Sequence, residues 1–255
     1  MAVDYKKEGK IAVFTLNRPP VNAINMELVR ELHKAMVSFR DDPDAWVGII
    51  TGAGEKAFSA GADIKDTLPF MKEHRDSPWD FPESLWRGLE VWKPLIAAIN
   101  GVTAGGGLEI ALACDLRVAA ENARLGTPEV TLGLIPGWGG TQRLPRVISK
   151  CKAAELLLTG KLISAQEAYR IGLVNEVVPA GEVMPKAMEW AETICQAAPL
   201  AVRAAKEAMI RGCSSTLEDG LRLENSLNTY LFATEDFAEG ITAFAEKRKP
   251  DYKAK

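Results

Sequence analysis

Residues 95–115 read LIAAINGVTAGGGLEIALACD and already indicate a fold class. Leu95–Asn100 is a short, almost wholly apolar run, which is typical of a strand buried on both faces of a sheet. Three consecutive glycines, Gly105–Gly107, separate it from Glu109–Ala113, which has a helical pattern. These glycines let a helix and a strand pack closely, or they let the backbone approach a ligand without a Cβ in the way.

Similar apolar runs lie on both sides of this stretch. Ile11–Leu16, Trp46–Thr51 and Leu116–Ala119 each resemble a strand. Between the first two, Met26–Arg40 places its apolar residues on one helical face. Apolar strands that alternate with helices predict a parallel sheet covered on both faces, so the expected class is α/β.

Two later segments have a different pattern. Thr67–Glu83 carries three prolines among aromatic residues, and such a long irregular stretch is typical of a functional loop or lid. Beyond residue 180 we expect no strand and divide the chain into a core, 1–190, and a helical region, 191–255. The helical segments are 182–196, 200–211, 217–233 and 235–246. The helical segment 217–233 carries an apolar stripe that packs either on the chain's own core or against another subunit. Its members are Leu217, Leu221, Leu227, Tyr230 and Leu231.

The composition excludes several classes of protein. Hydrophobic residues make up 47% and charged residues 25% of the 255 residues, which is ordinary for a globular chain and excludes a disordered one. The net charge of −3 indicates no basic surface of the kind that nucleic acid requires, so no nucleic-acid partner is expected. No apolar run reaches the roughly 18 residues that span a bilayer, and no secretory signal opens the chain. We therefore expect no membrane association and a cytoplasmic location.

The residues that commonly bind metals are few and scattered. The four cysteines form no CxxC pair, and we interpret them as free thiols in a reducing compartment: Cys114, Cys151, Cys195 and Cys213. Only two histidines, His33 and His74, are present, which nearly excludes a histidine-based site. No metal is expected.

Three glycine-rich stretches, 59–65, 105–109 and 136–141, lie near two glutamates in the sequence, and none matches a nucleotide-binding loop. Backbone N–H groups after the triple glycine would face a developing negative charge, and Ala62 would supply a second donor. Glu109, in an otherwise apolar segment, and Glu129, after Pro128, would together hold a water molecule and move protons. The alternatives are a helix-dipole role for Glu109 and a solvated loop position for Glu129.

Taken in order, these motifs resemble the crotonase (enoyl-CoA hydratase/isomerase) superfamily. The resemblance spans residues 11–249 and rests on residues 56–65 (KAFSAGADIK), 97–115 and 126–144 (GTPEVTLGLIPGWGGTQRL). It implies a spiral of ββα units with an acyl-CoA site in the core, and a C-terminal trimerisation region that assembles homotrimers or homohexamers, the latter as dimers of trimers. No cofactor is implied, since coenzyme A is part of the substrate.

The resemblance also implies a role for each matching residue. The N–H groups of Ala62 and Gly106 would form an oxyanion hole for the thioester carbonyl. Glu109, as base, and Glu129, as acid, would hydrate a 2-enoyl-CoA thioester to a 3-hydroxyacyl-CoA. The remaining residues would bind coenzyme A (Ala60, Ile64, Lys56 and Arg18) or line the acyl pocket (Phe70, Trp86 and Trp138).

Other members of the superfamily have different functions. Double-bond isomerases use the acid at the Glu129 position alone, so the presence of Glu109 favours a hydratase. RNA-binding homologues carry a Lys-rich first helix, whereas Met26–Arg40 has acidic residues beside its basic ones, which argues against RNA binding. The chain departs from well-known short-chain hydratases at Thr127 and Trp138, which leaves the acyl group undecided.

Overall fold

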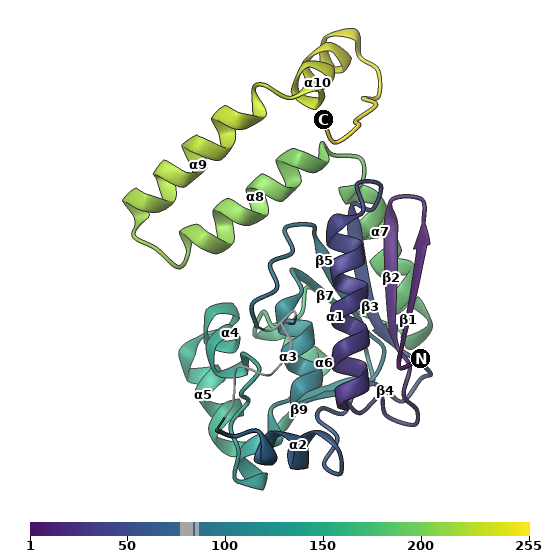
Figure 1. Ribbon diagram of the computed structural model, residues 1–255, viewed down its shortest axis with the longest axis vertical. Helices are drawn as coiled ribbons and strands as arrows, with labels where there is room; N and C mark the ends of the chain where they lie inside the picture. The colour runs from purple at the N-terminus through teal and green to yellow at the C-terminus, as the bar shows by residue number, and fades with distance from the viewer. Residues whose placement is uncertain (77–83, 85–86) are drawn as a thin grey trace.

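The computed structural model describes residues 1–76, 84 and 87–255. Within these residues two sheets form the centre of the molecule (Figure 1). The larger sheet has the order β1 (Val3–Glu8), β2 (Ile11–Leu16), β3 (Val47–Gly52), β5 (Leu95–Ile99), β7 (Leu116–Ala120), β10 (Glu176–Val178). The smaller sheet has the order β4 (Ala57–Ser59), β6 (Val102–Ala104), β8 (Arg124–Gly126), β9 (Leu162–Ser164).

The pairing confirms the predicted parallel sheet. The four apolar runs form β2, β3, β5 and β7, which are neighbours in that order and run parallel. β10 extends the same sheet in parallel, while β1 pairs with β2 as an antiparallel edge. Every residue of β3 and β5 is buried, as expected for strands with helices on both faces.

The chain passes between the two sheets in a repeated pattern. β3 is followed by β4, β5 by β6, and β7 by β8, so that each pair places one strand in the larger sheet and the next in the smaller. A helix or helical turn follows each pair: α2 (Thr67–Glu73), α3 (Gly106–Ala113) and the 3-10 turn η2 (Pro128–Leu132). This repeat is the predicted spiral of ββα units, and it brings the three segments after the strand pairs to one side of the molecule.

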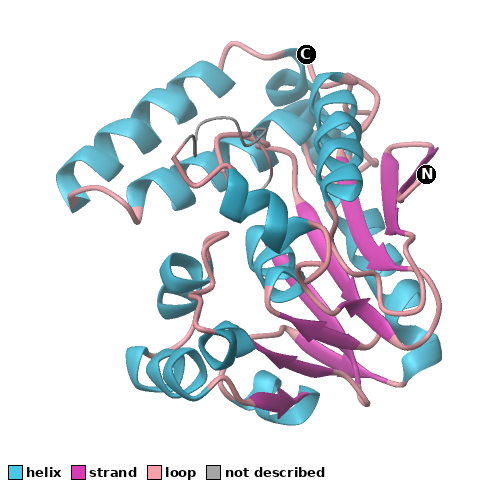
Figure 2. Cartoon of the chain, turned by 60° about the horizontal axis from the view of Figure 1, so that its bottom comes forward, coloured by secondary structure: helices cyan, strands magenta, loops and turns pink. Residues whose placement is uncertain are grey.

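Helices surround the strands (Figure 2). α1 (Met26–Asp41) begins where the Asn25 side chain accepts a hydrogen bond from the Leu28 N–H, and it buries the face bearing Leu32 and Phe39. α7 (Val183–Ile194) packs against β3, β5 and β7. The remaining helical elements of the core are α4 (Gly140–Val147), α5 (Lys150–Thr159), α6 (Ala165–Arg170) and the turn η3 (Ala180–Glu182).

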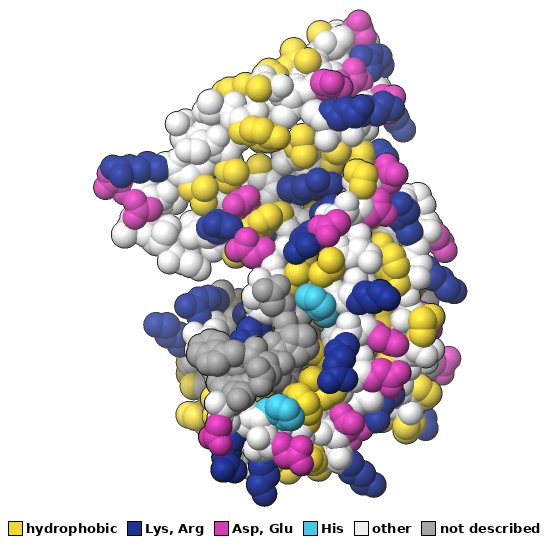
Figure 3. All heavy atoms as spheres, viewed as in Figure 1, with side chains coloured by type: hydrophobic (Ala, Val, Ile, Leu, Met, Phe, Trp, Pro, Cys, Tyr) yellow, Lys and Arg dark blue, Asp and Glu magenta, His cyan; other side chains and the backbone are white. Residues whose placement is uncertain are grey.

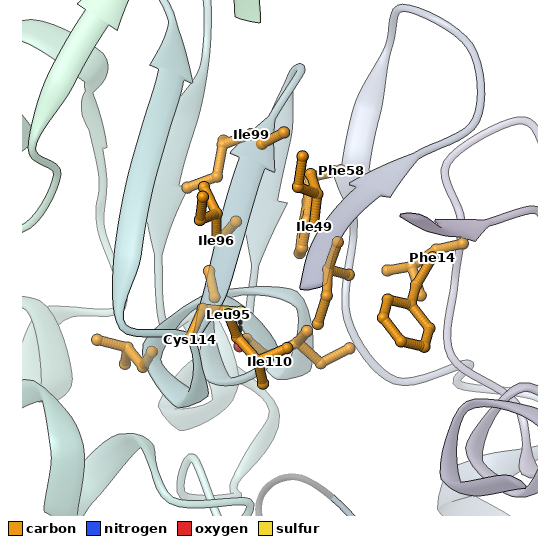
Figure 4. Packing of buried hydrophobic residues seen from close by; sticks show 14 of the residues in the cluster. Phe14, Ile49, Phe58, Leu95, Ile96, Ile99, Ile110 and Cys114 are labelled. Carbon is orange, nitrogen blue, oxygen red and sulfur yellow. Dashed lines mark hydrogen bonds between the residues drawn. The ribbon is translucent and has the colours of Figure 1, made fainter. Parts of the chain in front are cut away.

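The apolar core lies between the strands and α3. Ile49 and Ile96 lie at paired positions on the neighbouring strands β3 and β5, and Ile110 of α3 lies close to Leu95 (Figure 4). All four side chains are fully buried. α3 is therefore fixed by its apolar face, so the residues at its N-terminus occupy a defined place beside β4 and β6.

Three helices follow the core and lie apart from the sheets (Figure 1): α8 (Pro199–Gly212), α9 (Leu217–Leu231) and α10 (Glu235–Glu246). In the predicted stripe, Leu227 and Leu231 line a cavity between α8 and α9, whereas Leu217, Leu221 and Tyr230 are exposed. The predicted boundary at residue 190 falls inside α7, all of which precedes this helical layer.

The segment predicted to be irregular begins with a helix. α2 occupies Thr67–Glu73, with Pro69 in its first turn. Proline is tolerated there because the first N–H groups of a helix have no intrahelical acceptor, so this proline does not interrupt the helix. The last part of the predicted lid, residues 77–83, lies outside the described part of the chain.

The surface and the side-chain groupings add three observations. Basic and acidic side chains are interspersed on the face shown in Figure 3. In the part of the chain that the structure describes, no helix is long and apolar enough to cross a membrane. Among the same residues, no three or more His, Cys, Asp or Glu side chains are grouped to hold a metal ion.

Candidate active site

A pocket of about 530 Å³ opens where α2, α3, η2 and the loop before α4 meet. It brings together five of the residues predicted from the sequence: Ala62, Gly106, Glu109, Glu129 and Trp138. The remaining lining residues come from α2 and from the segment after Glu129: Leu68, Met71, Lys72, Leu132, Leu134, Ile135 and Gly137.

Ala62 and Gly106, whose backbone N–H groups are the predicted oxyanion-hole donors, line this pocket from different loops. Ile24 bridges Ala62 by donating to the Gly61 carbonyl and accepting from the Asp63 N–H, both at 2.8 Å, so the Ala62 N–H points away from Ile24. Gly106 is the first residue of α3, where an N–H has no acceptor within the helix. The loops touch, since a Cβ built on Gly61 would lie 3.3 Å from the Gly106 nitrogen.

Gly105 determines how closely Glu129 can approach these donors. Its φ of +54° is a conformation that residues with a Cβ rarely adopt. A Cβ at this position would lie 2.8 Å from Oε1 of Glu129. The carboxyl group therefore packs directly over the glycine, next to the N-terminus of α3.

Glu109 is held by the backbone of a distant turn. Its Oε1 accepts hydrogen bonds from the N–H groups of Trp138, at 2.7 Å, and Gly140, at 2.8 Å. The residue is only 2% exposed. Burial raises the pKa of Glu109 to about 7, with a further contribution from the charge of Glu129, while the two backbone donors and Arg143 act in the opposite direction. A carboxyl with this pKa exchanges protons near neutral pH.

Glu129 has fewer partners than Glu109. Its Oε2 is buried and has no hydrogen-bond partner within the described residues. Burial raises the pKa of Glu129 above its ordinary value, because an ionised oxygen without a donor is costly away from water. The two carboxyl groups therefore share one pocket in different environments, one bound by two N–H groups and the other poorly solvated.

Comparison with known proteins identifies the family of this chain. The sequence model described as enoyl-CoA hydratase/isomerase matches residues 6–255. The chain belongs to the enoyl-CoA hydratase/isomerase family. It is 44% identical to a short-chain-enoyl-CoA hydratase of Clostridium acetobutylicum, over 96% of this chain and 94% of that one. It is 42% identical to an (E)-benzylidenesuccinyl-CoA hydratase of Thauera aromatica, over 99% of each chain.

The fold agrees with this assignment. A crystal structure of an enoyl-CoA hydratase from Bacillus anthracis superposes with a TM-score of 0.93 at 41% identity and covers all of both chains. The resemblance to the crotonase superfamily, argued from three ordered motifs, is thus confirmed, and so is the spiral fold that it implied.

In this member of the family, Trp138 lies against the oxyanion-hole candidate Gly106. The Trp138 side chain is almost fully buried, and a Cβ on Gly106 would lie 2.6 Å from its Cζ3 atom. Leu132, Leu134 and Ile135 extend the apolar wall, and sequence reasoning missed them. The signal that could have revealed them is the placement of apolar residues on both sides of Gly133 and before Pro136, where a plain surface loop would be polar.

The other two acyl-pocket predictions have different outcomes. Phe70 is not among the residues that line the pocket, and its ring stacks on His74 with a centroid separation of 4.0 Å. Leu68 and Met71 of the same helix face the pocket. Trp86 lies outside the described residues.

The residues predicted to bind coenzyme A lie around the loop that precedes α2. Ala60 and Ile64 are exposed on this loop, and Lys56 is exposed before β4. Arg18 pairs with Asp63 at 2.7 Å and donates to the Ala23 carbonyl at 2.9 Å. In the structure Arg18 therefore holds the loop that carries Ala62.

Proposed function

We propose that this chain catalyses the reversible hydration of a 2-enoyl-CoA thioester to a 3-hydroxyacyl-CoA. One observation carries the proposal: Glu109, Glu129 and the backbone at Ala62 and Gly106 line the same pocket. Relatives that are 42–44% identical to this chain are named as hydratases, which supports the same reaction type.

In the proposed reaction the thioester oxygen lies between the N–H groups of Ala62 and Gly106. Glu109 takes a proton from water, and the water oxygen forms a bond to Cβ. The electron pair of the Cα–Cβ double bond then moves toward the thioester, so that negative charge develops on its oxygen. Glu129 gives its proton to Cα as the carbonyl re-forms. Each oxyanion-hole donor would supply about 3–4 kcal/mol of transition-state stabilisation.

The environments of the two glutamates suit these roles. The base must be ionised in a useful fraction of molecules, and the pKa of Glu109 near 7 allows this at neutral pH. The acid must hold a proton, and burial favours the protonated form of Glu129. An isomerase would need only the group at position 129, whereas here a second carboxyl is fixed by two backbone donors.

The acyl group would bind along the apolar wall of the pocket. The buried Trp138 side chain forms part of this wall, and we propose a short or compact acyl chain on this ground. Ala60 and Ile64 would contact coenzyme A through their backbone, with Lys56 and Arg18 near its phosphates or ribose. Glu109 and Glu129 supply the proton transfers, so we propose that no further cofactor takes part.

We also propose that α8, α9 and α10 form an oligomerisation region. Apolar side chains on these helices are exposed in the single chain, including Leu217 (80%), Phe232 (57%) and Phe244 (87%). Such a concentration of exposed apolar residues is typical of an interface. A homotrimer, or a hexamer of two trimers, should appear in light scattering after gel filtration, and a monomeric wild-type protein would contradict this.

The decisive experiment combines substitution with a substrate panel. Glu109→Gln and Glu129→Gln should each reduce hydration of crotonyl-CoA by about 10²- to 10⁴-fold, with little change in the binding of butyryl-CoA, which has no double bond. Glu121→Gln, at an exposed position, is the matched control. Full activity in either active-site variant would contradict the mechanism. A wild-type protein that moves the double bond of 3-enoyl-CoA but adds no water would instead be an isomerase.

A further inference from the structure

Arg143 of α4 lies beside the turn that holds Glu109. Its Nη1 donates to the carbonyl oxygen of Trp138 at 3.1 Å. The N–H of the same residue, Trp138, and that of Gly140 are the two donors to Glu109. Arg143 and Glu109 therefore contact the same three-residue turn, residues 138–140.

The turn has a conformation that needs this kind of support. Gly139 has a φ of +114°, which residues with a Cβ rarely adopt. A Cβ built there would lie 2.0 Å from Nη1 of Arg143, so the guanidinium group packs directly on the glycine. Gly139 is the N-cap of α4 and Gly140 is its first residue, so the Gly140 N–H has no acceptor within the helix and is available to the carboxylate.

The charge of Arg143 acts on the same carboxylate. Among the residues that the structure describes, the charges of Glu129 in η2 and of Arg143 act on Glu109, and Lys72 of α2 lines the same pocket. Arg143 favours the ionised form of Glu109. Burial lowers the pKa of Arg143 itself, so keeping a guanidinium at this place costs solvation.

We propose that Arg143 is a positioning residue for hydration: its hydrogen bond to the Trp138 carbonyl and its packing on Gly139 fix the 138–140 turn so that the N–H groups of Trp138 and Gly140 face Glu109. The inference rests on the proposed role of Glu109 as the base. Arg143 itself need not contact the substrate, because it acts through the Trp138 carbonyl and through its charge.

The test compares Arg143→Met and Arg143→Lys with a matched control. Arg146→Met is the control, since Arg146 lies on the same helix, is exposed and donates to the Gln142 carbonyl. For Arg143→Met we expect kcat for crotonyl-CoA to fall about 10- to 100-fold, because small misplacements of a catalytic group cost this much. Affinity for butyryl-CoA should change less than kcat, and the acid limb of the pH profile should move to higher pH.

The lysine variant separates charge from shape. Arg143→Lys keeps the cation but loses the planar fork, so the pH profile should return toward that of the wild type while kcat stays reduced. Wild-type kcat and pH profile in Arg143→Met would overturn the proposal. Equal loss in both variants with an unmoved pH profile would also overturn it, because that outcome shows only a structural role.

A measurement without substrate keeps this test independent of the proposed reaction. The titration of the Glu109 carboxyl can be followed by NMR of protein labelled with ¹³C in its glutamate carboxyls, with Glu109→Gln identifying the signal. Arg143→Met should raise the pKa of Glu109, and an unchanged titration would contradict the inference. If wild-type protein fails to hydrate every enoyl-CoA tested, the proposed function fails, and this titration still decides whether Arg143 controls Glu109.

Discussion

Replacing Glu109 by glutamine should slow hydration while making the folded protein more stable above neutral pH. The side chain is only 2% exposed, and its pKa rises from an ordinary 4.5 to about 7. At about 1.36 kcal/mol for each pKa unit, the ionised carboxylate costs the folded state about 3 kcal/mol relative to the unfolded chain. Glutamine keeps an oxygen that can accept from Trp138 and Gly140 and never carries this charge.

The sign of the effect depends on pH. Below pH 4.5 the carboxyl is protonated in both states, so it contributes no difference. Between 4.5 and about 7 it is ionised in the unfolded chain but still protonated in the folded one, so wild-type stability falls as the pH rises. Above about 7 both states are ionised and the full cost is present. The gain from Glu109→Gln should therefore be small near pH 5 and approach about 3 kcal/mol near pH 8.5.

The assay is urea unfolding of the wild type, Glu109→Gln and Glu121→Gln at these two pH values and one between them. Glu121 is exposed, so its glutamine variant controls for the loss of one negative charge. The reasoning is refuted if the stability difference between Glu109→Gln and the wild type does not change with pH. It is also refuted if the variant is less stable than the wild type near pH 8.5, since burial of the charge would then not dominate.

Three further predictions concern the same pocket. Gly105→Ala should destabilise the protein by about 1–3 kcal/mol in thermal melts, because alanine is strained at the positive φ of this position. The new Cβ should also push Glu129 away and lower kcat for crotonyl-CoA, and a wild-type kcat would contradict this prediction. Trp138→Ala should cost about 3–5 kcal/mol of stability and shift preference toward longer enoyl chains in a substrate panel, whereas an unchanged preference would exclude Trp138 from the acyl site. For the wild-type protein, kcat/KM should rise through pH about 7 as Glu109 ionises; a profile flat across neutrality would contradict the role of Glu109 as the base.

The sequence predicts the larger sheet well because its strands are buried on both faces. An uninterrupted apolar run as short as Leu95–Ile99, which lies between Pro94 and Gly101, favours a central strand over a buried helix. The smaller sheet could not be predicted in this way, since β4, β6 and β8 are three residues long and too short to show a period. β1 is an edge strand whose last three residues are exposed, and its polar composition prevented its recognition as a strand from the sequence.

The sequence predicts those parts of the pocket whose residues lie within one sequence motif. Glu109 and the triple glycine are neighbours in sequence, so one helix start brings them together. The partners of Glu109 are different: Trp138 and Gly140 lie 29 and 31 residues away, and they act through backbone N–H groups that any residue type except proline would supply. No pattern of side chains marks such a contact. It follows from the φ of Gly139 and from the packing of α4, which only the folded chain shows.

Trp138 connects binding of the acyl group to the chemistry in a way that spacing alone could not reveal. Its ring contacts Gly106, a proposed oxyanion donor, and lines the pocket, while its N–H binds Glu109 and its carbonyl accepts from Arg143. A side chain at this position that changes the space for the acyl group therefore also changes the packing against one proposed oxyanion donor. Substitutions here should alter kcat together with substrate preference, whereas changes at Leu132 or Ile135, which line the pocket without such bonds, should alter preference alone.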